Sequence, residues 1–128
     1  MAAPTFRKQE RIVSTRLIEM LFGKGDSQSL TAFPLRVVYL LTAHQDNCAP
    51  VQILISVPKK RFKHAVDRNR VKRQIREAYR HHKQILDGTV AEEKQLMIAF
   101  IWLSDRHCPS SVIEKKMVGI LQRIAKDS

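Results

Sequence analysis

The sequence predicts an α+β fold in a single domain over residues 1–128, with a sheet of about four strands covered by helices. Three observations support this prediction. Short apolar runs rich in β-branched and aromatic residues, typical of strands, alternate with segments whose apolar residues recur at helical spacing. A chain of 128 residues with 44% apolar residues can bury one hydrophobic core. The strongest helical pattern lies between strand-like runs, which predicts the order α-β(β)β-α-β-α.

The first half of the chain predicts one short helix and two strands. Ser14 is a candidate N-cap, and the helix would end at Gly23, a typical residue just past a helix C-terminus. Residues 23–32 form a turn-rich segment in which a short edge strand could lie, although periodicity does not show one. Residues 33–42 (FPLRVVYLLT) and 51–57 (VQILISV) are predicted strands, and Pro58 closes the second.

The second half predicts a helix, a strand and a final helix. The first of these helices would start near Ala65 or Asp67 and end before Gly88. Residues 95–103 (QLMIAFIWL) form a short, near-continuous apolar run, as in a strand buried on both faces. Ser111 and Glu114 have capping-box spacing, and the final helix presents an apolar face made of Ile113, Met117, Ile120, Leu121 and Ile124.

Positive charge is concentrated in one stretch of the chain. Eleven of the 25 residues in 59–83 are Lys or Arg and two are acidic, so this stretch holds +9 of the formal net charge of +11. Most of its cations fall on one helical arc beside an apolar arc, and a row of cations on a rigid helix matches a row of phosphates. A solvated charged helix, or a membrane-surface or calmodulin-target helix, is the alternative. The sequence pI near 10.2 favours a polyanionic partner.

Other patterns limit the function. No apolar run is long enough to span a membrane, the N-terminus lacks a signal-peptide core, and Cys48 and Cys108 are isolated, which together predict a reduced, cytoplasmic setting. The His44/Cys48 and His107/Cys108 pairs are too few for a zinc site. The acidic residues are scattered and no phosphate-binding loop or metalloprotease motif occurs, so we expect no catalytic residue in the polypeptide and no metal bound by the protein alone.

The run A-V-D-R-N-R-V-K-R-Q-I-R-E-A-Y-R at residues 65–80, after V-P-K-K at 57–60, resembles the signature of the protein component of bacterial ribonuclease P. The resemblance implies a ribosomal-protein-S5-domain-2-like fold with a left-handed β-α-β crossover. It also implies a protein subunit that binds the catalytic RNA and the 5′ leader of precursor tRNA and assists endonucleolytic removal of that leader. Catalysis would come from the RNA, with Mg²⁺ bound mainly through RNA. No obligate protein partner is predicted.

The same resemblance implies the site residues. The RNA-binding residues would be Lys59, Lys60, Arg68, Asn69, Arg70, Lys72, Arg73, Arg76 and Arg80. Phe22 and Tyr39 are candidates for a cleft that holds the leader, with core packing as the alternative for both. Residues 61–64 form a link one residue longer than is usual in the family. The alternative functions are a general RNA-binding protein of ribosomal type, a DNA-binding protein and a stand-alone nuclease.

Overall fold

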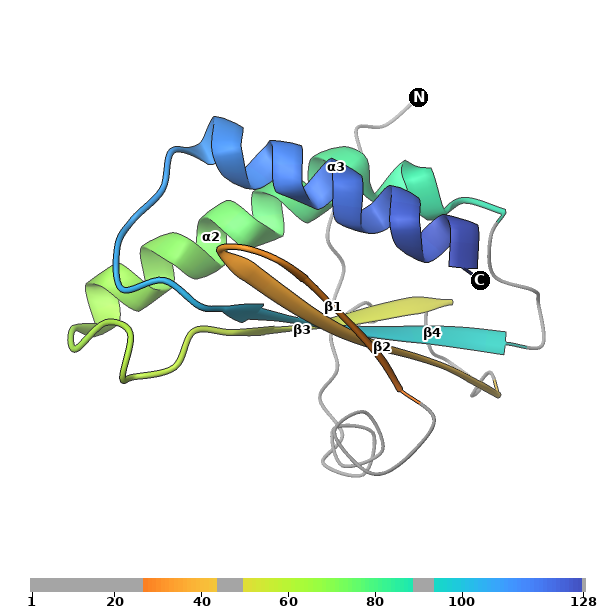
Figure 1. Cartoon of the computed structure of the whole chain (residues 1–128), viewed down its shortest axis with the longest axis horizontal. Helices are drawn as coiled ribbons and strands as arrows, with labels where there is room; N and C mark the ends of the chain where they lie inside the picture. The colour runs from red at the N-terminus through yellow and green to blue at the C-terminus, as the bar shows by residue number, and fades with distance from the viewer. Residues whose placement is uncertain (1–26, 44–49, 89–93, 128) are drawn as a thin grey trace.

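The computed structural model describes residues 27–43, 50–88 and 94–127. These residues form four strands, two α-helices and one 3₁₀ helix, coloured along the chain in Figure 1. The elements in chain order are β1 (Gln28–Ala32), β2 (Leu35–Ala43), β3 (Val51–Ser56), α2 (Ala65–His82), η2 (Lys83–Leu86), β4 (Lys94–Trp102) and α3 (Ser110–Asp127). The predicted α+β class is therefore confirmed.

The four strands form one mixed sheet in the order β1-β2-β4-β3. β1 and β2 make an antiparallel hairpin across a two-residue turn at Phe33 and Pro34, since Ala32 pairs with Leu35. β2 is antiparallel to β4, and β3 is parallel to β4. A parallel pair needs a long crossover connection, and here that connection contains α2. The left hand that the family resemblance implies for this crossover stays a prediction.

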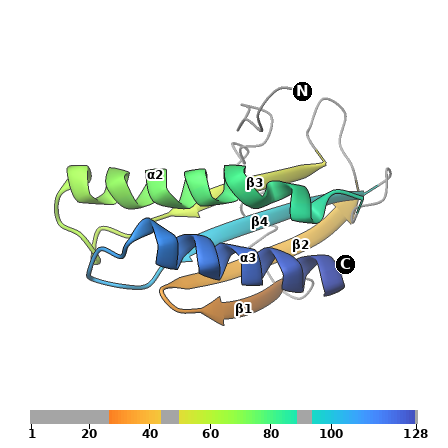
Figure 2. The ribbon, with the colours of Figure 1, turned by 90° about the horizontal axis from the view of Figure 1, so that it is seen from above.

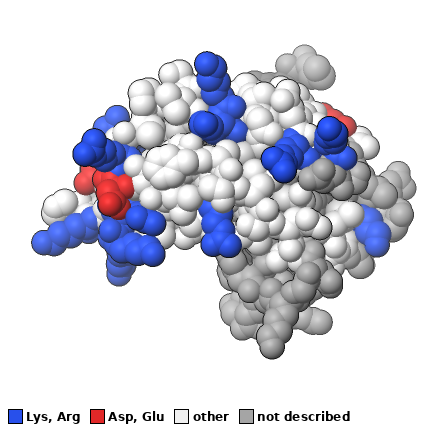
Figure 3. Space-filling model, in the orientation of Figure 1, with Lys and Arg blue, Asp and Glu red and all other residues white. Residues whose placement is uncertain are grey.

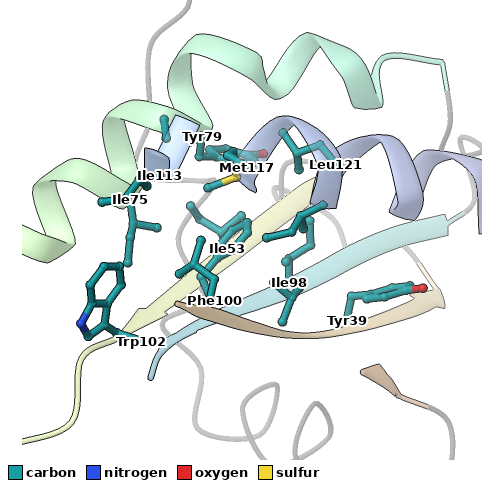
Figure 4. Close-up of a cluster of buried hydrophobic side chains, with 14 of the residues drawn as sticks. Tyr39, Ile53, Ile75, Tyr79, Ile98, Phe100, Trp102, Ile113, Met117 and Leu121 are labelled. Atoms are coloured by element: carbon teal, nitrogen blue, oxygen red, sulfur yellow. The ribbon is translucent and has the colours of Figure 1, made fainter. Parts of the chain in front are cut away.

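Both helices cover the same face of the sheet and lie side by side (Figures 1 and 2). The main core lies between them and the sheet, where Ile75 and Tyr79 of α2 approach Met117 of α3 and Phe100 of β4 (Figure 4). Burying one large apolar side chain stabilises a fold by about 1.5–3 kcal/mol. The predicted apolar face of the final helix is confirmed, because all of its residues are at most 1% exposed: Ile113, Met117, Ile120, Leu121 and Ile124.

The opposite face of the sheet is also buried along β2 and β4. Val38 and Leu40 pack with Met97 and Ala99 in a second apolar cluster. Beside this cluster the buried Gln95 side chain donates a hydrogen bond of 2.5 Å to the Gln52 amide oxygen, which satisfies two polar groups away from water. β4 is therefore buried on both faces, as its continuous apolar run predicts.

The position of α2 follows from its sequence. Val71, Ile75, Ala78 and Tyr79 recur at helical spacing and are all buried, so the opposite arcs of the helix are left for polar residues. The acid of the first turn and the basic residues of the last turn both match the helix dipole. The helical path continues through η2 and ends at Leu86, because Asp87 is extended. Gly88 follows with a φ of 73°, a conformation that glycine adopts without strain.

Several predicted boundaries change. A strand does form between residues 28 and 32, where periodicity shows none. β2 starts at Leu35 instead of residue 33, because Phe33 and Pro34 form the turn and proline cannot donate to the ladder. The predicted capping box is wrong. α3 starts at Ser110, and the Pro109 carbonyl accepts the first helical hydrogen bonds. The helix expected between Ser14 and Gly23 lies outside the described residues.

Candidate nucleic-acid interface

The cations of α2 differ in exposure. Asn69, Arg70 and Arg73 are exposed, whereas Lys72 and Arg76 are half-buried along the side of the helix. Half-buried side chains of this kind usually pack their aliphatic stems against the protein surface. In Arg76 the Nε atom is itself buried and has no hydrogen-bond partner among the described residues. The buried face of the helix fixes the direction of all these groups, since it is packed into the core.

A shallow hollow marks the start of this surface. Its volume is about 370 Å³, and it is lined by Val66, Asn69, Arg70 and Arg73. These residues recur every three or four positions, so they form one line along α2. The described residues offer no ion-pair partner to Arg70 or Arg73. Two arginines beside an amide and an exposed aliphatic side chain can bind a phosphate bidentately and contact a sugar or base.

The loop between β3 and α2 supplies further cations. Lys59, Lys60 and Lys63 are all exposed on this loop. Arg68 is directed back toward the loop, because its Nη1 donates hydrogen bonds to the carbonyl oxygens of Phe62, at 2.8 Å, and Lys63, at 3.1 Å. The structure thus gives Arg68 a part in holding the loop. Lysine and arginine side chains gather at this end of the molecule, where α2 begins (Figure 3).

Some basic residues of the stretch form ion pairs within the protein. Arg80 Nη2 lies 2.8 Å from Glu77 Oε2, and this hydrogen bond lowers the pKa of the Glu77 carboxyl and raises the pKa of Arg80. Arg61 Nη1 lies 3.4 Å from Asp105 Oδ1. Both partners of such a pair keep their charge, but the arginine already interacts with a carboxylate and is less available to a phosphate. Arg80 therefore differs from Arg70 and Arg73.

The last turn of α2 contacts α3 through histidines. His81 Nδ1 lies 2.9 Å from Glu114 Oε1, and His82 Nε2 lies 3.4 Å from the same oxygen. The hydrogen bond with His81 lowers the pKa of the Glu114 carboxyl. Arg80 Nη2 is also 2.9 Å from His81 Nε2. A neutral His81 satisfies both contacts, since its Nδ1–H can donate to Glu114 while Nε2 accepts from Arg80.

The structure describes only one of the two predicted cleft residues. Phe22 lies outside the described residues. Tyr39 is 7% exposed and belongs to the main core cluster, which favours core packing; its contact with a leader stays a prediction.

Sequence reasoning missed Lys63 and Arg106 as exposed cations and missed His107 as a partner of α2. Lys63 lies inside the basic stretch 59–83, and that stretch is the sequence signal that could have identified it.

Nothing in the described part of the chain suggests a catalytic metal centre, because no three His, Cys, Asp or Glu side chains there are placed to hold a metal ion. No helix among the described residues is long and apolar enough to cross a membrane. A mixed sheet that supports a basic helix, whose exposed Arg70 and Arg73 have no ion-pair partner among the described residues, is typical of a nucleic-acid-binding protein of the α+β class.

Comparison with known proteins makes the assignment specific. Residues 6–125 match the sequence model of the family described as Ribonuclease P, and the chain therefore belongs to this family. The "Ribonuclease P protein component" of Porphyromonas gingivalis strain W83 is 43% identical over 126 residues, which cover 95% of this chain and 89% of the relative. The relative of the same description from Chlorobium phaeobacteroides is 40% identical over 111 residues, covering 80% and 74%.

Solved structures show the same fold. The RNase P protein from Thermotoga maritima matches with a TM-score of 0.65 at 21% identity, over 89% of this chain and 96% of that chain. An RNase P protein mutant from Staphylococcus aureus, described as defective in mRNA degradation activity, matches with a TM-score of 0.67 at 24% identity, over 93% and 90%. The solved structures confirm the fold, and the family assignment makes the chain a protein subunit of the ribonuclease P ribonucleoprotein, an endoribonuclease of tRNA processing whose RNA is its partner.

Proposed function

We propose that the exposed cations of α2 and of the loop before it bind the ribonuclease P RNA, and that the assembled surface also holds the 5′ leader of precursor tRNA. The observation that supports this proposal most strongly is the hollow at the start of α2, whose two arginines have no ion-pair partner among the described residues. Neutralising a phosphate releases counterions, which drives binding without reading sequence. The proposed RNA-binding residues remain Lys59, Lys60, Arg68, Asn69, Arg70, Lys72, Arg73, Arg76 and Arg80.

The ion pairs and hydrogen bonds of these residues indicate which of them contribute most to RNA binding. Arg70 and Arg73 are exposed and unpaired in the described structure, so they can reach phosphates without breaking an existing contact. Arg80 would first have to give up part of its hydrogen bonding to Glu77. Arg68 already donates to two loop carbonyls, and it would contribute mainly by shaping the loop. We therefore assign the largest contribution to Arg70 and Arg73.

The protein's part in the reaction is to bind and orient. In this proposal the RNA performs the hydrolysis, and Mg²⁺ is bound mainly through RNA, while the protein's cations reduce repulsion between the phosphates of the catalytic RNA and those of the substrate. Phe22 and Tyr39 stay candidates for stacking on leader bases. The whole chain would act as one domain in the cytoplasm, the setting that we propose for this step of tRNA processing.

The test compares precursor tRNA with mature tRNA. The affinity of the ribonuclease P RNA for each is measured alone and with the protein, at one fixed salt concentration. We expect the protein to tighten binding of precursor tRNA more than that of mature tRNA, because only the precursor has a leader. Equal tightening of both would contradict the leader contact.

A variant comparison tests the surface itself. The double variant Arg70→Ala/Arg73→Ala should keep the packing of α2 against the core, because both replaced side chains are exposed and alanine favours a helix. Lys115→Ala with Lys116→Ala removes the same charge from exposed positions on α3 and serves as the control. If the two variants support precursor binding equally well, the start of α2 is not the site.

A further inference from the structure

The loop between β3 and α2 is fixed by contacts that reach across the molecule. Phe62 is only 8% exposed and packs with the main core, which is unusual for a residue between two exposed or half-exposed basic neighbours. Its ring stacks on that of His107, with centroids 4.6 Å apart and planes at 17°. His107 lies in the connection between β4 and α3, so it joins this loop to a distant part of the chain.

His107 also contacts the first turn of α2. Its Nε2 lies 3.0 Å from Asp67 Oδ1, with both side chains partly buried. Phe62, Asp67 and His107 therefore form one cluster, which we call the anchor cluster, at the junction of three segments. Nearby, Gln74 Nε2 donates to the Cys108 carbonyl at 3.0 Å and thus joins the same connection to α2 a second time.

The anchor cluster determines where three lysines lie. Lys59 and Lys60 precede Phe62, and Lys63 follows it directly. All three are exposed, and the described residues give none of their side chains a hydrogen bond or ion pair; only the backbone carbonyl of Lys63 accepts a hydrogen bond, from Arg68. The backbone of the loop is thus held while the charged ends stay available. A loop fixed in this way avoids part of the ordering cost that a flexible basic loop would have on binding.

We infer that the anchor cluster positions Lys59, Lys60 and Lys63 against phosphates of the ribonuclease P RNA, and that Lys63 is a further RNA-binding residue. Phe62, Asp67 and His107 act as positioning residues, since their side chains are directed into the protein or toward each other. This inference rests on the proposed function of the basic surface. It also gives a role to the longer link at residues 61–64, which places Phe62 in the core and Lys63 beside it.

The experiment is a thermodynamic cycle on the affinity of the full-length protein for the ribonuclease P RNA. Four proteins are compared: wild type, His107→Ala, the triple variant Lys59→Ala/Lys60→Ala/Lys63→Ala, and the variant with all four changes. Thermal unfolding of each protein shows that it is folded at the assay temperature. If His107→Ala does not fold, His107→Phe takes its place, because it keeps a ring against Phe62 and loses only the contact with Asp67.

We expect the triple variant to reduce the slope of log affinity against log salt by about 2 to 3. His107→Ala should weaken binding roughly three- to tenfold, which lies in the lower part of the range for residues coupled through a shared backbone segment. When the lysines are absent, His107→Ala should change affinity less than twofold, because nothing is left for the cluster to position. The matched control is Lys115→Ala/Lys116→Ala/Lys126→Ala, in which His107→Ala should keep its full effect.

Three results would overturn the inference. His107→Ala could leave affinity unchanged, or it could weaken binding by the same factor with and without the lysines, which is what a general loss of structure would produce. The triple variant could also behave like its control on α3. None of these results would refute the proposed function, because the Arg70/Arg73 variant tests that function at separate residues.

Discussion

Replacing Arg70 and Arg73 together by alanine should flatten the salt dependence of RNA binding. Both side chains are exposed, line one hollow and have no ion-pair partner among the described residues. Each phosphate contact contributes about 0.7 to 0.9 to the slope of log affinity against log salt. Two lost contacts thus reduce the slope by about 1.4 to 1.8.

This slope has a direct consequence for measured affinities. Between 50 and 200 mM salt, each contact accounts for roughly a 2.6- to 3.5-fold loss, so two contacts account for roughly 7- to 12-fold. The difference between variant and wild type should therefore be largest at 50 mM and shrink by that factor at 200 mM. The assay is equilibrium binding to fluorescently labelled ribonuclease P RNA across this salt range.

The control for this prediction is the double alanine variant at Lys115 and Lys116, which removes an equal charge from exposed positions on α3. Long-range attraction alone would flatten both slopes alike. Parallel lines for the Arg70/Arg73 variant and wild type, or equal flattening by the control, would refute the reasoning. Unfolding free energies should stay within about 0.5 kcal/mol of wild type, as is usual for surface changes.

Three further outcomes are expected. Ile75→Ala should lower the free energy of unfolding by about 2–5 kcal/mol in a denaturant titration, because Ile75 is fully buried between α2 and the sheet; a loss below about 1 kcal/mol would contradict its packing. Glu114→Gln should reduce stability above pH 4.5 by less than about 1 kcal/mol. The difference should vanish as pH falls through the lowered folded-state pKa of Glu114, and a difference that grows on acidification would have the wrong sign. Cys48→Ser with Cys108→Ser should leave precursor cleavage by the assembled enzyme unchanged, whereas a loss restored by zinc would show a metal role.

The sequence predicts well what depends on local periodicity. α2 is evident because Val71, Ile75 and Tyr79 recur at helical spacing among cations, and β4 is evident because its apolar run is too short for a helix and has no polar face. β1 was not evident, because Gln28–Ala32 mixes small and polar residues, and its strand state depends on pairing with β2. Local patterns cannot show such pairing.

The proposed RNA interface also depends on contacts that local sequence patterns cannot show. The basic stretch predicts that α2 binds RNA, but the sequence pattern does not distinguish Arg68, Arg73 and Arg80 from one another. In the structure they differ, since Arg68 donates to loop carbonyls, Arg80 is paired with Glu77 and Arg73 is exposed. The stacking of Phe62 on His107 joins residues far apart in the chain, and no periodicity or spacing rule brings them together.

The central claim, that this protein assists an RNA catalyst by binding, is tested most directly by precursor-tRNA cleavage at low Mg²⁺. The reaction is followed with the ribonuclease P RNA alone, with the RNA plus this protein, and with the protein alone. The account predicts clear stimulation of the RNA by the wild-type protein, weaker stimulation by the Arg70/Arg73 variant, and no cleavage by the protein alone. Cleavage by the protein alone, or equal stimulation by wild type and variant, would contradict the account.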